Sequence, residues 1–408
     1  MLMSRVVITG MGMYSPLGSE AGECMDNLKT LKNRVEVMEL LGEYSGMLCH
    51  VAAPVKSELP SYPRKKTRTM GRVGILATAA TEKAIADAGL TDSPLLSDGS
   101  TGIAYGSSGG SFNAMTDCAG FVTDRNVTSI NATTYVSMMP HTVAVNLAIF
   151  FGIHGRIIAT STACTSGSQG IGYAYECIRS GAHRIMVAGG AEELSPFTVG
   201  VFDAMFVASQ CNDNPELTPK PFDRKRDGIV VGEGAGTLIL EDYDHAVARG
   251  AKIYGEIVGF ATNCDASHIT NPSSEHMEKC MRMALSNAGL KPEDIGYVNA
   301  HGTGTSSGDI AESTATFRVF GKNVPVSTLK SYMGHTLGAA GALEAEMTIL
   351  MQRQGWFAPN LNLTEPDPLC GDLDYITGNG RVLSAEYAMS NNFAFGGVNT
   401  SLIFRLME

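Results

Sequence analysis

One of the nine cysteines has a sequence setting that suits a nucleophile. Cys164 lies in the run STACTSGSQG, which follows the apolar segment RIIAT and precedes residues with helical spacing. A cysteine at such a strand-to-helix turn lies at a helix N-terminus, where free N–H groups and the helix dipole lower the pKa of the thiol. Small neighbours let a substrate approach. The pattern predicts a nucleophilic cysteine, and the alternative is a buried, unreactive cysteine.

Two histidines could act together with that cysteine. His301 ends the apolar segment YVNA and precedes GTGT, and His335 follows KSYMG and precedes a segment rich in Gly and Ala. A single histidine of this kind is more often structural, but two at strand ends, each next to glycine, favour a shared site. No HExxH motif and no clustered Cys/His spacing occurs in the sequence, so we expect no metal.

An internal duplication would bring these residues together. The segment AIADAGL at 84–90 returns as ALSNAGL at 284–290, and CTSGSQG at 164–170 matches HTLGAAG at 335–341. Short apolar runs alternate with longer helical stretches, which predicts an α/β protein with parallel sheets covered by helices. We expect two similar layered halves, residues 1–250 and 251–408. The first half would carry an insertion between about 110 and 155, and Cys164 would face His335.

Composition limits the remaining classes of function. The chain has 408 residues, of which 44% are hydrophobic and 17% charged, and this suits a large buried core. The sequence shows no signal peptide and no apolar stretch long enough to span a membrane. Cysteines without paired spacing favour reduced thiols and a cytoplasmic location. A net charge of −11 argues against nucleic acid as the main partner.

The same negative charge would repel an acidic protein partner, which would therefore need a local basic patch. The densest basic run consists of Arg64, Lys65, Lys66 and Arg68. Such a run is typical of a solvated helix face, and its alternative is a docking surface. The sequence leaves both readings open.

Four motifs identify a family. In order, TACTSG, HGTGT, KSYMGH and NNFAFGGVN resemble the β-ketoacyl-[acyl carrier protein] synthases of types I and II, which are elongating condensing enzymes of the thiolase superfamily. The resemblance covers nearly the whole chain. It implies a thiolase-like duplicated αβαβα layered fold, which agrees with the duplication. It also implies an acyltransferase that performs a decarboxylative Claisen condensation without a cofactor.

The resemblance assigns roles to individual residues. Cys164 corresponds to the acyl-accepting nucleophile, and His301 and His335 to the pair that binds the malonyl thioester and promotes loss of carbon dioxide. Lys330 resembles the family lysine beside the second histidine, and Glu312 the acid that pairs with it, with Asp309 completing the motif. The remaining matches are Thr303 and Thr305 for the phosphopantetheine arm, Phe395 for the gate and oxyanion hole, and Phe393 at the start of the gate loop.

The acyl pocket and the assembly also follow from the resemblance. Gly109 stands where some relatives place a bulky gate, and Met139 would lie at the far end of the pocket, near a dimer partner. Small and flexible residues there suggest room for an elongated or unsaturated chain. The apolar segment 131–155 packs either in its own core or against another subunit.

We therefore expect acyl carrier protein, in its acyl and malonyl forms, as the partner, and a homodimer or a heterodimer with a chain-length-factor-like relative. The pathway, whether fatty-acid, polyene or polyketide, stays open. A non-catalytic relative and a cysteine hydrolase are the alternatives. The retained cysteine, histidines and lysine disfavour the first, and the lack of an obvious orienting carboxylate disfavours the second.

Overall fold

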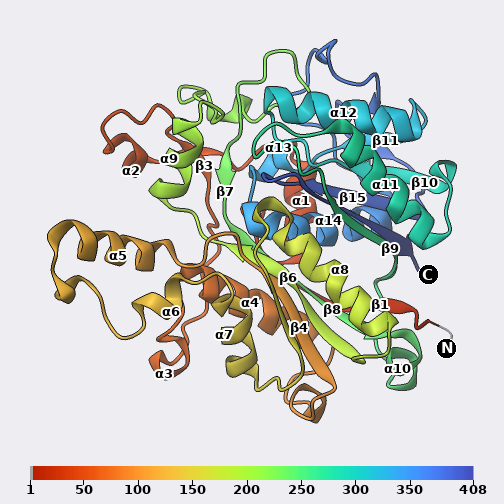
Figure 1. The fold of residues 1–408 in the computed structure, drawn as a ribbon. Helices are drawn as coiled ribbons and strands as arrows, with labels where there is room; N and C mark the ends of the chain where they lie inside the picture. Colours follow the sequence, from red (N-terminus) through yellow and green to blue (C-terminus); the bar gives the residue numbers. More distant parts are fainter. Residues whose placement is uncertain (1–2, 408) are drawn as a thin grey trace.

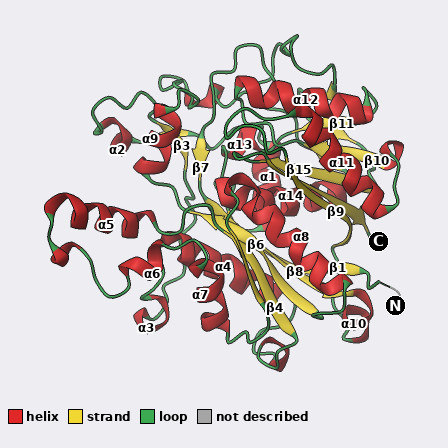
Figure 2. Ribbon diagram, in the orientation of Figure 1, coloured by secondary structure: helices red, strands yellow, loops and turns green. Residues whose placement is uncertain are grey.

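A single mixed sheet of eleven strands runs through the protein (Figures 1 and 2). The computed structural model describes residues 3–407. The strand order is β13-β11-β10-β15-β16-β9-β1-β8-β6-β4-β5, and β1 joins β9 at the centre by antiparallel pairing. On one side lie β1 (Val6–Tyr14), β4 (Thr101–Gly106), β5 (Ile157–Thr160), β6 (Ile185–Glu192) and β8 (Gly234–Asp242). On the other lie β9 (Gly255–Cys264), β10 (Ile295–Asn299), β11 (Pro325–Ser327), β13 (Asp374–Tyr375), β15 (Tyr387–Phe393) and β16 (Val398–Leu406).

The two sides repeat one order of elements. In the first, β1, α4, β4, β5, α8, β6 and β8 follow one another, and in the second β9, α11, β10, β11, α14, β15 and β16 do so. The helices of this repeat are α4 (Arg72–Asp87), α8 (Ser166–Arg179), α11 (Ser274–Ala288) and α14 (Ala340–Gln354), with α12 (Ser306–Phe320) between β10 and β11. The α/β class is confirmed. Because the sheet is continuous, the division at residues 250 and 251 stays a prediction.

The sheet is mixed and not purely parallel, contrary to the prediction. Strand β8 runs antiparallel to β6 and β1, and β16 runs antiparallel to β15 and β9. The strands β15 and β16 are joined by the short loop 394–397, which cannot make the crossover that parallel neighbours need. The strands next to the catalytic motifs remain parallel: β4 with β5 and β6, and β10 with β11 and β15.

The repeated alanines have a packing role. Gly10 of β1 lies against Ala84 of α4 and Ala88 at the end of that helix, so close that a Cβ at Gly10 would stand 2.3 Å from the carbonyl oxygen of Ala84. In the second half, a Cβ at Gly259 of β9 would stand 2.7 Å from the carbonyl oxygen of Ala284 in α11. The sequence motif is repeated because in each half a helix packs closely against a glycine of a strand. Only small side chains on the helix allow this close packing.

The matched glycines of α8 and α14 correct the register of the second repeat. The turn η3 (Ala163–Thr165) precedes α8, and η6 (Leu337–Ala339) precedes α14, so Cys164 corresponds to Gly338 and not to His335. Gly167 faces Gly338 and α14, and Gly341 faces Ser168 of α8. The sequence alignment was shifted by about one helical turn. Both segments have glycines spaced by three residues, so a shift of three residues still aligns glycine with glycine.

The insertion forms three helices, α5 (Phe112–Asp124), α6 (Thr134–Met138) and α7 (Thr142–Phe151). Helix α7 packs in the first half's core through Val143, Ala144 and Leu147. Helix α5 instead projects away from the body (Figure 1) and, with α6, leaves Val122 and Tyr135 exposed.

The other elements frame this core. Among residues 3–407, no helix is long and apolar enough to cross a membrane. The remaining helices are α1 (Ala21–Lys29), α2 (Glu39–Gly42), α3 (Arg64–Thr67), α9 (Pro196–Ala204), α10 (Tyr243–Ala248) and α13 (Lys330–Met333). A small sheet holds β2 (Glu36–Val37), β3 (Val51–Ala53) and β7 (Val231–Gly232), and another holds β12 (Trp356–Phe357) and β14 (Arg381–Val382).

Candidate active site

Cys164 sits on a tight turn between β5 and α8. The preceding residue, Ala163, has a φ of 50°, a conformation that L-residues rarely adopt. The turn is held from within, because Thr162 N–H donates to Ser166 Oγ at 3.0 Å and Ser166 Oγ–H donates to the Ala163 carbonyl at 2.7 Å. This geometry lifts Cys164 out of the regular backbone at the start of α8, as in a nucleophile elbow.

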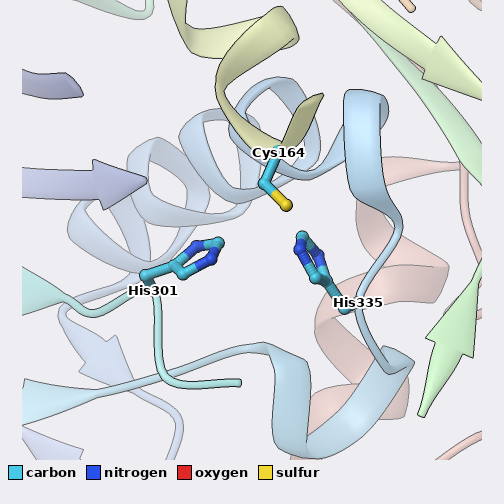
Figure 3. A group of neighbouring side chains, drawn as sticks. All are labelled: Cys164, His301 and His335. Atoms are coloured by element: carbon cyan, nitrogen blue, oxygen red, sulfur yellow. The ribbon is translucent and has the colours of Figure 1, made fainter. Parts of the chain in front are cut away.

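The structure brings Cys164 together with His301 and His335 (Figure 3). One ligand atom from each of the three side chains lies within 4.8 Å of those of the others. The two imidazole rings stand edge to face, with centroids 5.0 Å apart and an interplanar angle of 88°. All three side chains are buried. Within residues 3–407, these three residues lie close enough together that they could hold a metal ion. That no metal is needed stays a prediction.

Both histidines are neutral. Burial lowers the pKa of His301 and of His335 well below the ordinary value, and the charge of Lys330 lowers both further. The backbone N–H of Leu337 donates to Nδ1 of His335 at 3.2 Å, so the proton of this neutral ring is on Nε2. That Nε2 is buried and has no hydrogen-bond partner among the described residues. His335 therefore offers one fixed N–H donor to the site.

Lys330 pairs with Glu344 and not with Glu312, which corrects the prediction. The ammonium of Lys330 and the carboxylate of Glu344 form an ion pair that is almost completely buried. The side-chain amide of Asn392 donates to the second oxygen of Glu344 at 2.7 Å. Sequence reasoning missed Glu344, although an acid inside the apolar helix segment AGALEAEM indicates either a buried partner or a raised pKa.

Glu312 instead shapes the loop that carries His301. Its two carboxylate oxygens accept the backbone N–H groups of His301 and Gly302 at 2.6 and 2.7 Å. Asp309 accepts the N–H groups of the next two residues of the loop, both at 3.1 Å. Burial raises the pKa of Glu312 to about 8 and that of Asp309 to about 6, against the opposing hydrogen bonds. The two acids are thus positioning residues for the loop after β10.

Two pockets meet at Cys164. The first, here called the histidine pocket, has a volume of about 270 Å³ and is lined by His301, His335, Thr303, Thr305 and Phe393, with His268 at its wall. The second, here called the apolar pocket, also has a volume of about 270 Å³ and is lined by Gly109 and by aromatic side chains. Cys164, Phe202 and Phe395 belong to both linings. The thiol can therefore be reached from two sides of different chemistry.

The thiol is protonated in this setting, contrary to the prediction from the helix terminus. Burial raises the pKa of Cys164 to about 12. The charge of Lys330 and the backbone N–H groups of Cys164 and Phe395 oppose this rise. Burial depends on tertiary packing, and it outweighs the local effect of the helix end. The same two N–H groups, converging on the sulfur, form a candidate oxyanion hole.

The remaining predicted residues lie away from this centre. Arg64, Lys65, Lys66 and Arg68 are all exposed on and next to α3, and none of them lines either pocket. The ammonium of Lys66 lies 4.6 Å from the ring centre of Phe150. Met139 also lines neither pocket within this chain. Its backbone instead packs beside Gly110, next to the wall of the apolar pocket.

Comparison with known proteins assigns the chain to a family. The family described as "Beta-ketoacyl synthase, N-terminal domain" matches residues 3–246, and its "C-terminal domain" matches residues 254–364. The chain is 36% identical to a 3-oxoacyl-[acyl-carrier-protein] synthase 2 from Synechocystis sp., over 98% of each chain.

Solved structures give the same picture. A β-ketoacyl synthase from Burkholderia phymatum superposes with a TM-score of 0.98 and 53% identity over 100% of both chains. The ishigamide ketosynthase/chain length factor has a TM-score of 0.91 at 29% identity, over 100% of both chains. A type II PKS acyl-carrier protein in complex with its ketosynthase gives 0.88 at 32%, over 99% of this chain and 100% of that one. The chain belongs to the β-ketoacyl synthase family of condensing acyltransferases.

Proposed function

We propose that this enzyme holds an acyl group as a thioester on Cys164 and extends it by two carbons taken from malonyl-[acyl carrier protein]. The observation that carries the proposal is the position of Cys164 at the junction of the histidine and apolar pockets. A condensing enzyme must present one thioester to two reactants. The apolar side suits an acyl chain, and the side with two neutral imidazoles suits the malonyl group.

In the first half-reaction the acyl group moves from its carrier to the enzyme. The sulfur of Cys164 attacks the thioester carbonyl, a new S–C bond forms, and the carrier's thiol leaves. Because the Cys164 thiol is protonated at neutral pH, its proton must move as the bond forms. We assign the leaving sulfur of the carrier as the acceptor of this proton, so the carrier departs as a neutral thiol and both histidines stay neutral.

In the second half-reaction the malonyl thioester enters the histidine pocket, with its pantetheine arm along Thr303 and Thr305. The malonyl carboxylate leaves as carbon dioxide, and its bonding electron pair becomes an enolate. The N–H groups of His301 and His335 hold the enolate oxygen. The enolate carbon then attacks the acyl thioester, and the N–H groups of Cys164 and Phe395 hold the second oxyanion. Its collapse releases the β-ketoacyl product and the Cys164 thiolate, which takes up a proton from solvent to restore the thiol.

The partners form part of the proposal. We assign acyl carrier protein as the donor of both groups, and its docking surface to Arg64, Lys65, Lys66 and Arg68, which are exposed cations on an acidic protein. We also assign a dimer, since the projecting helix α5 and the exposed apolar side chains of the insertion suit burial against a second subunit. The cytoplasmic location stays part of this proposal.

A second candidate is the catalytic subunit of a heterodimer with a chain-length-factor-like relative. The similarity to the ishigamide ketosynthase/chain length factor supports it. Native mass spectrometry of the purified chain separates the two: an active homodimer supports the first, and a chain that gains activity only with a second protein supports the other. A fully active monomer contradicts both assemblies.

Incubation with acyl and malonyl carrier proteins, followed by mass spectrometry, tests the chemistry. We expect an acyl adduct on Cys164 and a product longer by two carbons. Cys164→Ala abolishes both, whereas Cys164→Gln, which resembles the acylated side chain, retains malonyl decarboxylation. Cys211→Ala is the matched control, because Cys211 lies outside both pockets. An acyl adduct that persists in Cys164→Ala contradicts the assignment.

A further inference from the structure

The apolar pocket has several aromatic rings in its wall. Four phenylalanines line it, and most of its other lining residues are small or aliphatic. Its described lining comprises Ser108, Gly109, Phe112, Met115, Ala163, Cys164, Phe197, Thr198, Val201, Phe202, Leu337 and Phe395. An aliphatic chain needs only apolar area, which leucine or isoleucine would supply equally well. Apolar area alone therefore does not account for four phenylalanines in this pocket.

Phe112 occupies the space that Gly109 leaves. A Cβ at Gly109 would stand 2.8 Å from the ring of Phe112, so the absence of a side chain there admits the ring. This corrects the expectation that Gly109 opens extra room for the acyl chain. The Phe112 ring is 7% exposed and pairs with the ring of Phe197 at a centroid distance of 5.9 Å and an angle of 44°.

Phe112 is also held firmly by the backbone. Its N–H donates to Oε1 of the buried Glu193 at 2.6 Å, and Oε2 of the same carboxylate accepts the N–H of Val73 at 2.7 Å. Glu193 thus ties the first residue of α5 to the first turn of α4. A ring anchored in this way is preorganised and is not a mobile filler.

A second pair of rings lies against the nucleophile. Phe202 and Phe395 have centroids 5.9 Å apart at an angle of 38°, and both line the pocket together with Cys164. An acyl chain that extends from the sulfur through this pocket therefore meets aromatic faces or edges from two ring pairs. Aromatic groups prefer offset-stacked or edge-to-face contacts with other π systems.

We infer that the acyl group carried by Cys164 is a flat chain with conjugated double bonds, an inference that rests on the proposed condensing function. A conjugated chain presents a π face to these rings, whereas a saturated chain presents only C–H bonds. Each aromatic contact favours the conjugated chain by about 2- to 10-fold beyond the area it buries. A conjugated chain also loses fewer rotatable bonds on binding.

Two acyl groups of equal length test the inference. 2,4-Hexadienoyl and hexanoyl groups are loaded on the same acyl carrier protein, and the rate of acylation of Cys164 is followed by mass spectrometry. The readout is the ratio of the dienoyl rate to the hexanoyl rate. Comparison of this ratio between variants removes the intrinsic difference in thioester reactivity. The variants are Phe112→Leu and Phe197→Leu, and the control is Phe317→Leu on the exposed side of α12.

We expect the ratio to fall by about 2- to 10-fold in each pocket variant and to stay at its wild-type value in Phe317→Leu. Phe197 is 62% exposed, so its variant folds even if the Phe112 variant does not. A ratio that is unchanged in Phe197→Leu, with both groups still transferred to Cys164, overturns the inference and leaves the condensing function intact. Failure of wild-type enzyme to accept either group contradicts the condensing function itself.

Discussion

The buried ion pair of Lys330 and Glu344 allows stability and catalysis to be separated. Glu344→Gln removes the negative partner and leaves a buried ammonium without a counter-charge. Breaking a buried pair in this way destabilises a protein by about 3–5 kcal/mol, a large part of the roughly 5–15 kcal/mol that holds a typical domain folded. Lys330 is 1% exposed and Glu344 is 0% exposed, so water cannot screen the charge that remains.

The double variant Lys330→Met with Glu344→Gln should recover most of that loss. Replacement of a whole buried pair by neutral side chains of similar size is often close to neutral for stability. Lys330→Met alone should lose less than Glu344→Gln, because burial already raises the pKa of Glu344 and the acid can take up a proton. A double-mutant cycle should therefore give a coupling free energy of about 2–4 kcal/mol.

Catalysis should not recover with stability. The charge of Lys330 lowers the pKa of Cys164, His301 and His335. Without that charge the pKa of each histidine rises. On acidification, each histidine is therefore protonated at a higher pH than in the wild-type enzyme, and the neutral form is lost there. The thiol pKa also rises, and each unit lowers the thiolate fraction about tenfold. The double variant should fold but acylate slowly, with the acid limb of its pH profile moved to higher pH.

Urea unfolding and the pH dependence of Cys164 acylation measure these two effects on the same samples. The matched control is Arg249→Met with Glu241→Gln, because this pair is also largely buried but lies outside both pockets. The control should change stability and leave the pH profile where it is. If the active-site double variant keeps the wild-type pH profile, Lys330 does not tune the histidines, and the reasoning fails.

Three further predictions concern the surface, the pocket and a buried acid. Lys65→Glu with Arg68→Glu should raise the KM for acyl carrier protein about tenfold and weaken the salt dependence of this KM. A pantetheine thioester without the carrier should be used normally. If the variant and the wild-type enzyme have equal KM values, these basic residues are a solvated surface and not a docking site. Met139→Trp should shorten the products without blocking transfer of short acyl groups, and an unchanged product length in gas chromatography contradicts a role for this residue. Burial raises the pKa of Glu346 well above its ordinary value. In the folded protein this side chain therefore keeps a proton that it loses in the unfolded chain above about pH 4.5. The free energy of unfolding falls as pH rises towards the pKa of Glu346 in the folded protein. Glu346→Gln should remove this dependence, up to about 1.4 kcal/mol per pH unit, as measured by urea unfolding at pH 5 and pH 8.

The nucleophile and both histidines were predictable because each carries its own local signal. All three follow an apolar strand or a glycine turn, and the ends of parallel strands meet at one edge of a sheet. The partner of Lys330 was not predictable in this way. Glu312 and Glu344 both lie on helices near the site, and only the packing of α12 and α14 decides which carboxylate reaches the ammonium.

Two other errors have the same origin in long-range packing. The thiol pKa of Cys164 follows burial, which no local motif reports, and not the helix end beside it. Gly109 predicted open space in the acyl pocket, but the ring of Phe112 fills this space. In both cases the local sequence describes a backbone turn correctly, while the environment comes from side chains that other elements supply.

The duplicated turns show how one local structure serves two chemical purposes. Ala163 and Leu337 take up nearly the same backbone conformation, with φ of 50° and 48°, at matching positions before α8 and α14. In the first half this turn lifts Cys164 into the junction of the two pockets. In the second half the residue that corresponds to the cysteine is Gly338, which has no side chain to offer, and the backbone N–H of Leu337 fixes the tautomer of His335 instead. The first half thus supplies the nucleophile and the second orients a donor, so each half depends on the other for a complete site.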